Sequence, residues 1–136
     1  MPGTVLVVED EEAIRRLLVA ALREQAPLEV DAARDGVDAL HQVTTRAYDV
    51  VVLDLMMPYM TGIDFLDSLT AMLSDPSLGT LAVPPSVIIV TGASPEQVPS
   101  ESIESRFPNL VRLVLRKPLQ AGELARRVEE LLTRQA

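Results

Sequence analysis

Residues 50–62, with the sequence VVVLDLMMPYMTG, decide the fold of this chain. Its first four residues are apolar and three of them are β-branched, as in a short strand that is buried on both faces. The run ends at Asp54, and Pro58 and Gly62 mark a turn before apolar residues return at helical spacing. A buried strand that leads through a turn into a helix is typical of α/β proteins with a parallel sheet.

Four further apolar runs have the character of strands. Residues 5–8 and 87–90 are continuous, residues 110–115 are interrupted only by Arg112, and residues 28–33 alternate, which places that strand nearer an edge. Between the runs, apolar residues recur every three or four positions. This spacing predicts helices around residues 14–22, 37–43, 63–73 and 124–132.

The order of these elements predicts a flavodoxin-like, doubly wound α/β fold. We expect five parallel strands in the order 2-1-3-4-5, with helices on both faces of the sheet. The length of 136 residues fits one domain, with a core at about residues 4–133. In this fold, ligands bind beyond the carboxyl ends of the strands, at the switch between strands one and three.

Composition excludes several classes of function. The formal net charge of −8 opposes binding to phosphate backbones and anionic membranes, and two Phe, two Tyr and no Trp offer few surfaces for base stacking. The apolar runs are too short to span a membrane, and the sequence lacks cysteine and a secretion signal. We therefore expect no direct contact with nucleic acid or membrane, and a cytoplasmic location.

Polar residues stand where the predicted strands end. Glu9 and Asp10 follow the first strand, Asp54 the third, Thr91 the fourth and Lys117 the fifth. Strands one and three are neighbours in this topology, so the three carboxylates should converge and repel one another unless a cation intervenes. Ligands that offer only oxygen favour magnesium, with manganese or calcium as alternatives, and magnesium commonly bridges to a phosphate.

This arrangement suits the transfer of a phosphoryl group. Asp54 would be the nucleophile, since aspartyl phosphates are known covalent intermediates. Lys117 would hold one phosphoryl oxygen as a point charge, and the Thr91 hydroxyl would donate to another. Each residue has an ordinary explanation when taken alone, such as a helix-start acid or a turn hydroxyl, but one topology brings them all to the same edge.

Four blocks of the sequence resemble the signatures of response-regulator receiver domains, the phosphoacceptors of two-component signalling in the CheY-like superfamily. They are Val-Val-Glu9-Asp10-Glu11, Val-Val-Leu-Asp54-Leu-Met-Met-Pro58-Tyr-Met-Thr-Gly62, Val-Thr91-Gly-Ala and Lys117-Pro118, and they occur in the right order over nearly the whole chain. The resemblance implies a single receiver domain over residues 1–136 with no output domain. It would then be a switch rather than a stand-alone enzyme, although receivers commonly remove their own phosphoryl group.

The resemblance also implies partners and further details of the site. A sensor histidine kinase or a histidine phosphotransfer protein would phosphorylate Asp54, and the change would alter binding to a downstream protein. The backbone carbonyl of Met56 would be a fourth metal ligand beside Glu9, Asp10 and Asp54, and the peptide bond before Pro118 would be cis.

The sequence departs from the family pattern in four places. Val114 stands where receivers usually have an aromatic residue, three positions before the lysine, and Glu9 replaces the commoner aspartate. Pro99 would disrupt a helix over residues 95–107, so we expect that helix to begin late, at about Ser100, or to be irregular. Residues 74–86 predict an extended loop.

Three alternatives stay open at this point. The chain could be a receiver excised from a longer regulator or hybrid kinase, or a degenerate receiver that only binds partners, although Asp54, Thr91 and Lys117 are all present. A metal-dependent phosphatase would use the same carboxylates, but such enzymes usually have a general acid two residues after the nucleophile. Met56 occupies that position and cannot act as an acid.

Overall fold

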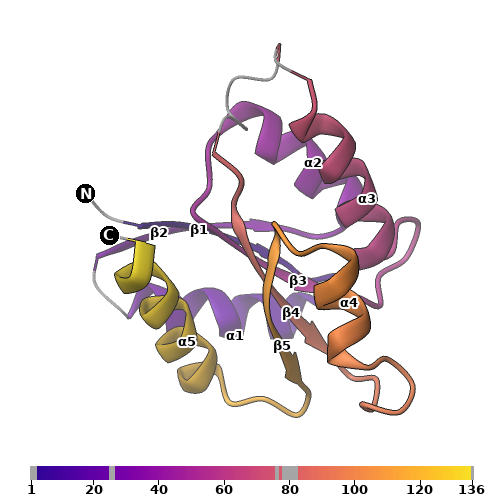
Figure 1. Cartoon of the computed structure of the whole chain (residues 1–136). Coiled ribbons are helices and arrows are strands. Elements are labelled where there is room, and N and C mark those ends of the chain that lie inside the picture. Colours follow the sequence, from indigo (N-terminus) through magenta and orange to yellow (C-terminus); the bar gives the residue numbers. More distant parts are fainter. Residues whose placement is uncertain (1–2, 25–26, 76, 78–82, 136) are drawn as a thin grey trace.

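A computed structural model describes residues 3–24, 27–75, 77 and 83–135 of the chain (Figure 1). The described residues form a sheet of five parallel strands in the order β2-β1-β3-β4-β5. The strands are β1 (Gly3–Val8), β2 (Leu28–Ala33), β3 (Val50–Asp54), β4 (Ser86–Thr91) and β5 (Val111–Arg116), and the helices are α1 (Glu12–Arg23), α2 (Gly36–Thr45), α3 (Gly62–Leu73), α4 (Ser100–Arg106) and α5 (Ala121–Gln135). The predicted flavodoxin-like fold is confirmed.

Two apolar layers enclose the sheet. Helices α1 and α5 cover one face, while α2, α3 and α4 cover the other (Figure 1). Every residue of strands β3 and β4 is buried, which explains why both are apolar except for Ser86 at the start of β4 and for Asp54 and Thr91 at their ends. Strand β2 lies at one edge of the sheet, as its sequence predicts, but its burial does not alternate: only Val30 and Ala33 of its six residues are buried.

The observed boundaries differ only locally from the predicted ones. Strand β5 spans Val111–Arg116 rather than residues 110–115, and Leu110 instead accepts a hydrogen bond from Val87 just before the strand. Helix α4 begins at Ser100, as predicted from Pro99, and has only seven residues. Helix α3 ends at Leu73 and β4 begins at Ser86, so Ser86 belongs to the strand and not to the predicted loop at 74–86. Residues 76 and 78–82 of that loop lie outside the described part.

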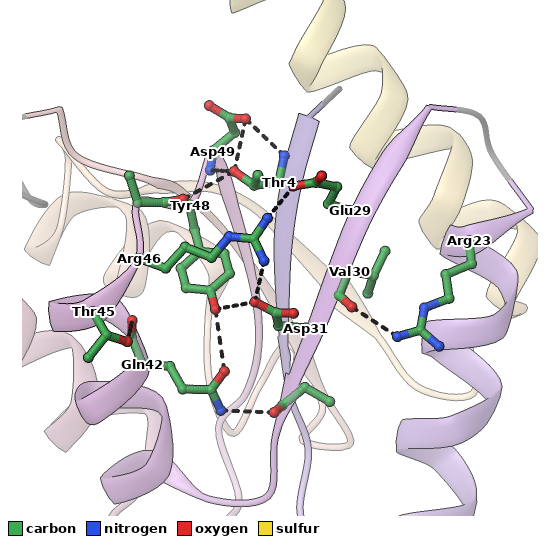
Figure 2. Close-up of polar contacts among 12 residues, drawn as sticks. Thr4, Arg23, Glu29, Val30, Asp31, Gln42, Thr45, Arg46, Tyr48 and Asp49 are labelled. Atoms are coloured by element: carbon green, nitrogen blue, oxygen red, sulfur yellow. Dashed lines mark hydrogen bonds and ion pairs between the residues drawn. The ribbon is translucent and has the colours of Figure 1, made fainter. Parts of the chain in front are cut away.

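A polar network fastens the edge strand β2 to the segment between α2 and β3 (Figure 2). Arg46 forms ion pairs with Glu29 and Asp31 of β2, and its guanidinium lies over the Tyr48 ring, 5.8 Å from the centroid. The Tyr48 hydroxyl donates to Asp31 at 2.6 Å and contacts Gln42 at 3.3 Å. Burial, together with the hydrogen bond to Asp31, raises the pKa of Tyr48 far above its usual value, so the hydroxyl stays a donor.

We expect Tyr48→Phe to lower the free energy of unfolding by about 1–2 kcal/mol, because it removes a hydrogen bond from a buried ring to a charged acceptor. Urea denaturation at neutral pH measures this change. Tyr59→Phe is the matched control: Tyr59 is 95% exposed, and its variant should stay within about 0.5 kcal/mol of the wild type. Equal stability of the two variants would show that the network does not hold the edge.

Candidate functional site

The topology brings the predicted site residues to one edge of the sheet. Glu9 and Asp10 directly follow β1, and Asp54 is the last residue of β3, whose neighbour in the sheet is β1. One carboxylate oxygen from each of the three residues lies within 4.8 Å of the others. Glu9 and Asp54 are buried, at 2% and 4% exposure, whereas Asp10 is partly exposed. The expected convergence of the three carboxylates is confirmed.

Lys117 supplies the positive charge of this cluster. Its Nζ lies 3.3 Å from Oε2 of Glu9 and 3.5 Å from Oδ2 of Asp54, so it bridges the two buried carboxylates. Lys117 follows β5, and its backbone N–H donates to the carbonyl of Thr91 at 2.8 Å, which fixes the end of β5 against β4. The Lys117–Pro118 peptide bond is cis, as the resemblance implied. Lys117 is also the only lysine of the whole sequence.

Backbone amides orient the two buried carboxylates. The Met56 amide donates to Oδ1 of Asp54 at 3.1 Å, and the Glu11 amide donates to Oε1 of Glu9 at 3.3 Å. In both cases an amide two residues further along the chain holds one oxygen and leaves the other facing Lys117. The loops that follow β1 and β3 thus orient the side chains of Glu9 and Asp54.

Burial dominates the acid–base properties of the site. It raises the pKa of Glu9 above its usual value, and the negative charge of Asp54 adds to this effect against the pull of Lys117. Burial likewise raises the pKa of Asp54, although the Met56 amide and Lys117 oppose it. For Lys117, burial disfavours the charge, but the attraction of Asp54 and Glu9 outweighs burial and raises its pKa. The raised pKa favours the protonated, positively charged form of Lys117. The raised pKa values of Glu9 and Asp54 show that Lys117 does not fully offset the effect of burial on these two carboxylates.

Thr91 ends β4 beside this cluster and is fully buried. Its Oγ1 accepts a hydrogen bond from the Ala93 amide at 3.1 Å. A hydroxyl that accepts one hydrogen bond can still donate its own hydrogen. The loop after β4 thus holds this side chain in place, and its hydroxyl can still act as a donor.

Gly62 lies against the backbone of Asp54, the candidate phosphoacceptor. The sequence indicated a turn at Gly62 but not this close contact. Its amide donates to the carbonyl of Leu55 at 2.9 Å. A Cβ atom at this position would lie 2.8 Å from the Asp54 carbonyl oxygen and 2.8 Å from the Leu55 Cα atom. Only glycine allows α3 to begin this close to the end of β3 without a shift of the backbone.

The structure also places four other residues. His41 is exposed on α2. Met57 packs into the core, whereas Met56 is 69% exposed. Val114, at the position of the usual aromatic residue, is half-buried and packs against the apolar layer under α2, α3 and α4.

Comparison with known proteins identifies the family. The model of the response regulator receiver domain matches residues 5–129. The chain therefore belongs to the receiver domains of two-component response regulators. Among curated relatives, the sensory transduction protein RegX3 of Mycolicibacterium smegmatis is 34% identical over 133 residues, which are 98% of this chain and 52% of that protein. A protein-glutamate methylesterase/protein-glutamine glutaminase of Myxococcus xanthus is 41% identical over 96 residues, 70% of this chain and 25% of that protein.

Solved structures agree with this assignment. The receiver domain of a Francisella response regulator is 29% identical, with a TM-score of 0.75 and coverage of 98% of this chain and 99% of the other. The response regulator TrrA of Thermotoga maritima, solved in complex with magnesium and beryllofluoride, is 27% identical, with a TM-score of 0.72 and coverage of 95% and 98%. The chain thus matches isolated receivers end to end but spans about half or less of these two curated relatives. Of the helices in the described residues, none has the length and apolarity to cross a membrane.

Proposed function

We propose that this chain is a phosphorylation-dependent signalling switch that accepts a phosphoryl group on Asp54 with the help of magnesium. The observation that carries the proposal is the convergence of three carboxylates and one ammonium group at the carboxyl ends of β1, β3 and β5. Two of the carboxylates are buried, where repulsion is screened less than at the surface.

The donor set fits magnesium. Glu9, Asp10 and Asp54 offer only oxygen, and their spacing allows one ion to contact all three groups directly or through water. Raised pKa values of Glu9 and Asp54 indicate a site in which added positive charge is favourable. The carbonyl of Met56 is the fourth proposed ligand, and manganese is an alternative ion. When bound, the ion would neutralise charge on the phosphoryl oxygens.

The protein side chains would divide the transfer step among them. An oxygen of Asp54 attacks phosphorus, so an O–P bond forms while the N–P bond of a phosphohistidine breaks and its electron pair returns to the imidazole. The Met56 amide holds Oδ1 of Asp54, which directs Oδ2 toward Lys117. Lys117 and the Thr91 hydroxyl would then contact phosphoryl oxygens.

Membership of the receiver family supports two kinds of partner, a phosphodonor and a downstream protein, without naming either. The donor would be a sensor histidine kinase or a histidine phosphotransfer protein in the cytoplasm, and the output would be changed binding to a downstream protein. The relatives named above are longer proteins, and their whole activities belong to their full chains. We propose that residues 1–136 act as one receiver domain, either alone or as the receiver of a longer regulator.

Labelling by a small phosphodonor tests the proposed function. Wild-type protein incubated with phosphoramidate or acetyl phosphate should gain one phosphoryl group only when magnesium is present, and peptide mapping should place it on Asp54. A chain that stays unlabelled would instead support the degenerate receiver that only binds partners, and a chain that is labelled equally well without a divalent ion would exclude the proposed role of magnesium.

Asp10→Ala should weaken magnesium binding at least about tenfold, because it removes the most accessible of the three converging carboxylates. Titration calorimetry of the unphosphorylated protein measures the affinity without any transfer step. Glu11→Ala is the matched control, since it removes the same charge one position away from an exposed side chain. Equal affinities of the two variants would exclude Asp10 as a ligand.

A further inference from the structure

The side chain of Arg116 connects the phosphorylation site with the start of α4. Arg116 is the last residue of β5 and directly precedes Lys117. In the sheet it pairs with Thr91 of the neighbouring strand β4. Its Nη1 donates to the carbonyl of Ala93 at 3.1 Å, and its Nη2 donates to the carbonyl of Val98 at 2.6 Å and to Oγ of Ser100 at 3.0 Å. We call this set of three hydrogen bonds the Arg116 bridge.

The bridge spans a small closed turn in the connection between β4 and α4. Within that turn, the Ser94 amide donates to the Gln97 side chain at 3.0 Å, and the Gln97 amide donates to Oγ of Ser94 at 3.2 Å. The Val98 amide also donates to the carbonyl of Ser94 at 2.9 Å. Because Arg116 bonds to Ala93 before the turn and to Val98 after it, the whole turn is fixed to β5 as one unit.

Helix α4 depends on such external support. It has seven residues, fewer than an isolated helix needs to be stable in water. Its N-cap residue is Pro99, whose side chain has no oxygen with which to cap the first turn. Arg116 holds its first residue from the β5 side, and Arg106 near its other end pairs with Asp67 of α3 at 2.8 Å.

The bridge is linked to two residues of the phosphorylation site, Thr91 and Lys117. Ala93, whose carbonyl accepts from Arg116, donates its amide to the Thr91 hydroxyl. Lys117, the neighbour of Arg116 in the chain, contacts Glu9 and Asp54. A new charged group on Asp54 would draw on both Thr91 and Lys117, and each is one residue or one hydrogen bond away from the bridge.

We propose that the Arg116 bridge holds α4 and its preceding turn in the arrangement of the unphosphorylated chain, and that a phosphoryl group on Asp54 must loosen the bridge. This inference rests on the proposed function. Val114 of β5 has no polar group that could link the phosphorylation site to α4. In this chain Arg116, on the same strand, would provide that link. Because coupling between two sites is reciprocal, removing the bridge should also strengthen binding of a phosphoryl group at Asp54.

The test compares Arg116→Ala with the wild type, using beryllofluoride with saturating magnesium as the probe. In the wild type, the probe should increase amide hydrogen exchange in residues 93–106. In Arg116→Ala, exchange there should be high without the probe and change little on its addition, and the probe should bind at least about fivefold more tightly, the lower end for coupled sites. Arg112→Ala, at an exposed arginine of the same strand, should behave as the wild type.

Each other outcome overturns the proposal in a recognisable way. Faster exchange in Arg116→Ala with unchanged probe affinity would mean that the bridge merely supports α4. Unchanged exchange and affinity would mean that the bridge has no role. If Arg116→Ala does not fold, Ser100→Ala removes one acceptor and should shift both measurements in the same direction by less. Failure of the wild type to be labelled on Asp54 would instead overturn the proposed function, and the inference with it.

Discussion

Asp54→Asn is expected to abolish labelling by phosphoramidate or acetyl phosphate, with a fall in rate of at least about 10³-fold. The amide has nearly the same shape as the carboxylate but no charge and almost no nucleophilicity at oxygen. The position is otherwise well prepared: the Met56 amide holds one oxygen, and Lys117 lies 3.5 Å from the other. Loss of the nucleophile should therefore leave a folded but unreactive site.

Mass spectrometry of the intact protein measures this loss. Asp75→Asn is the matched control, because it makes the same chemical change at an exposed aspartate after α3, and it should be labelled as fast as the wild type. The unfolding midpoint of Asp54→Asn should equal or exceed that of the wild type in the absence of metal, since the change removes a charge from a crowded, buried cluster. Labelling of the Asn variant at the wild-type rate would exclude Asp54 as the acceptor.

Gly62→Ala is expected to lower the free energy of unfolding by about 1–3 kcal/mol, the usual range for overpacking. The added methyl group would lie 2.8 Å from two backbone atoms, the Asp54 oxygen and the Leu55 Cα, neither of which can rotate away as a side chain can. The strain falls on the peptide that carries the acceptor, so labelling of Asp54 should slow as well.

Chemical denaturation and the labelling assay together check this expectation. Gly122→Ala is the matched control: nothing lies within 4 Å of its added Cβ, and alanine is the better helix former. That variant should be as stable as the wild type or more stable by up to about 1 kcal/mol, with normal labelling. A Gly62→Ala protein that matched the control in both measurements would show that the contact is not a constraint.

The arrangement of strands could be predicted because it depends on local patterns. Continuous apolar runs place β3 and β4 in the middle of the sheet, and the residue that ends each run then falls at one edge. For the same reason the convergence of Glu9, Asp10 and Asp54 followed from topology alone. The late start of α4 followed from Pro99.

What could not be predicted are contacts between side chains far apart in the sequence. Glu9 was expected only as a metal ligand, yet its carboxylate also pairs with Lys117, 108 positions away. The contacts of Arg116 and the network around Arg46 likewise depend on rotamers and on loop paths that no residue pattern specifies. The metal ligands and the acceptor role stay predictions that the proposed experiments address.

The presence of a single lysine, Lys117, makes the site chemically addressable in an otherwise unmodified chain. Every other basic side chain except His41 is an arginine, which does not react with amine-selective acylating reagents under mild conditions. Apart from the terminal amine, such a reagent can therefore report on one position alone, and ligands that engage or release this amine will change its rate of modification. The occupancy of the switch can in this way be followed by covalent footprinting, without a fluorophore, a tag or an engineered residue.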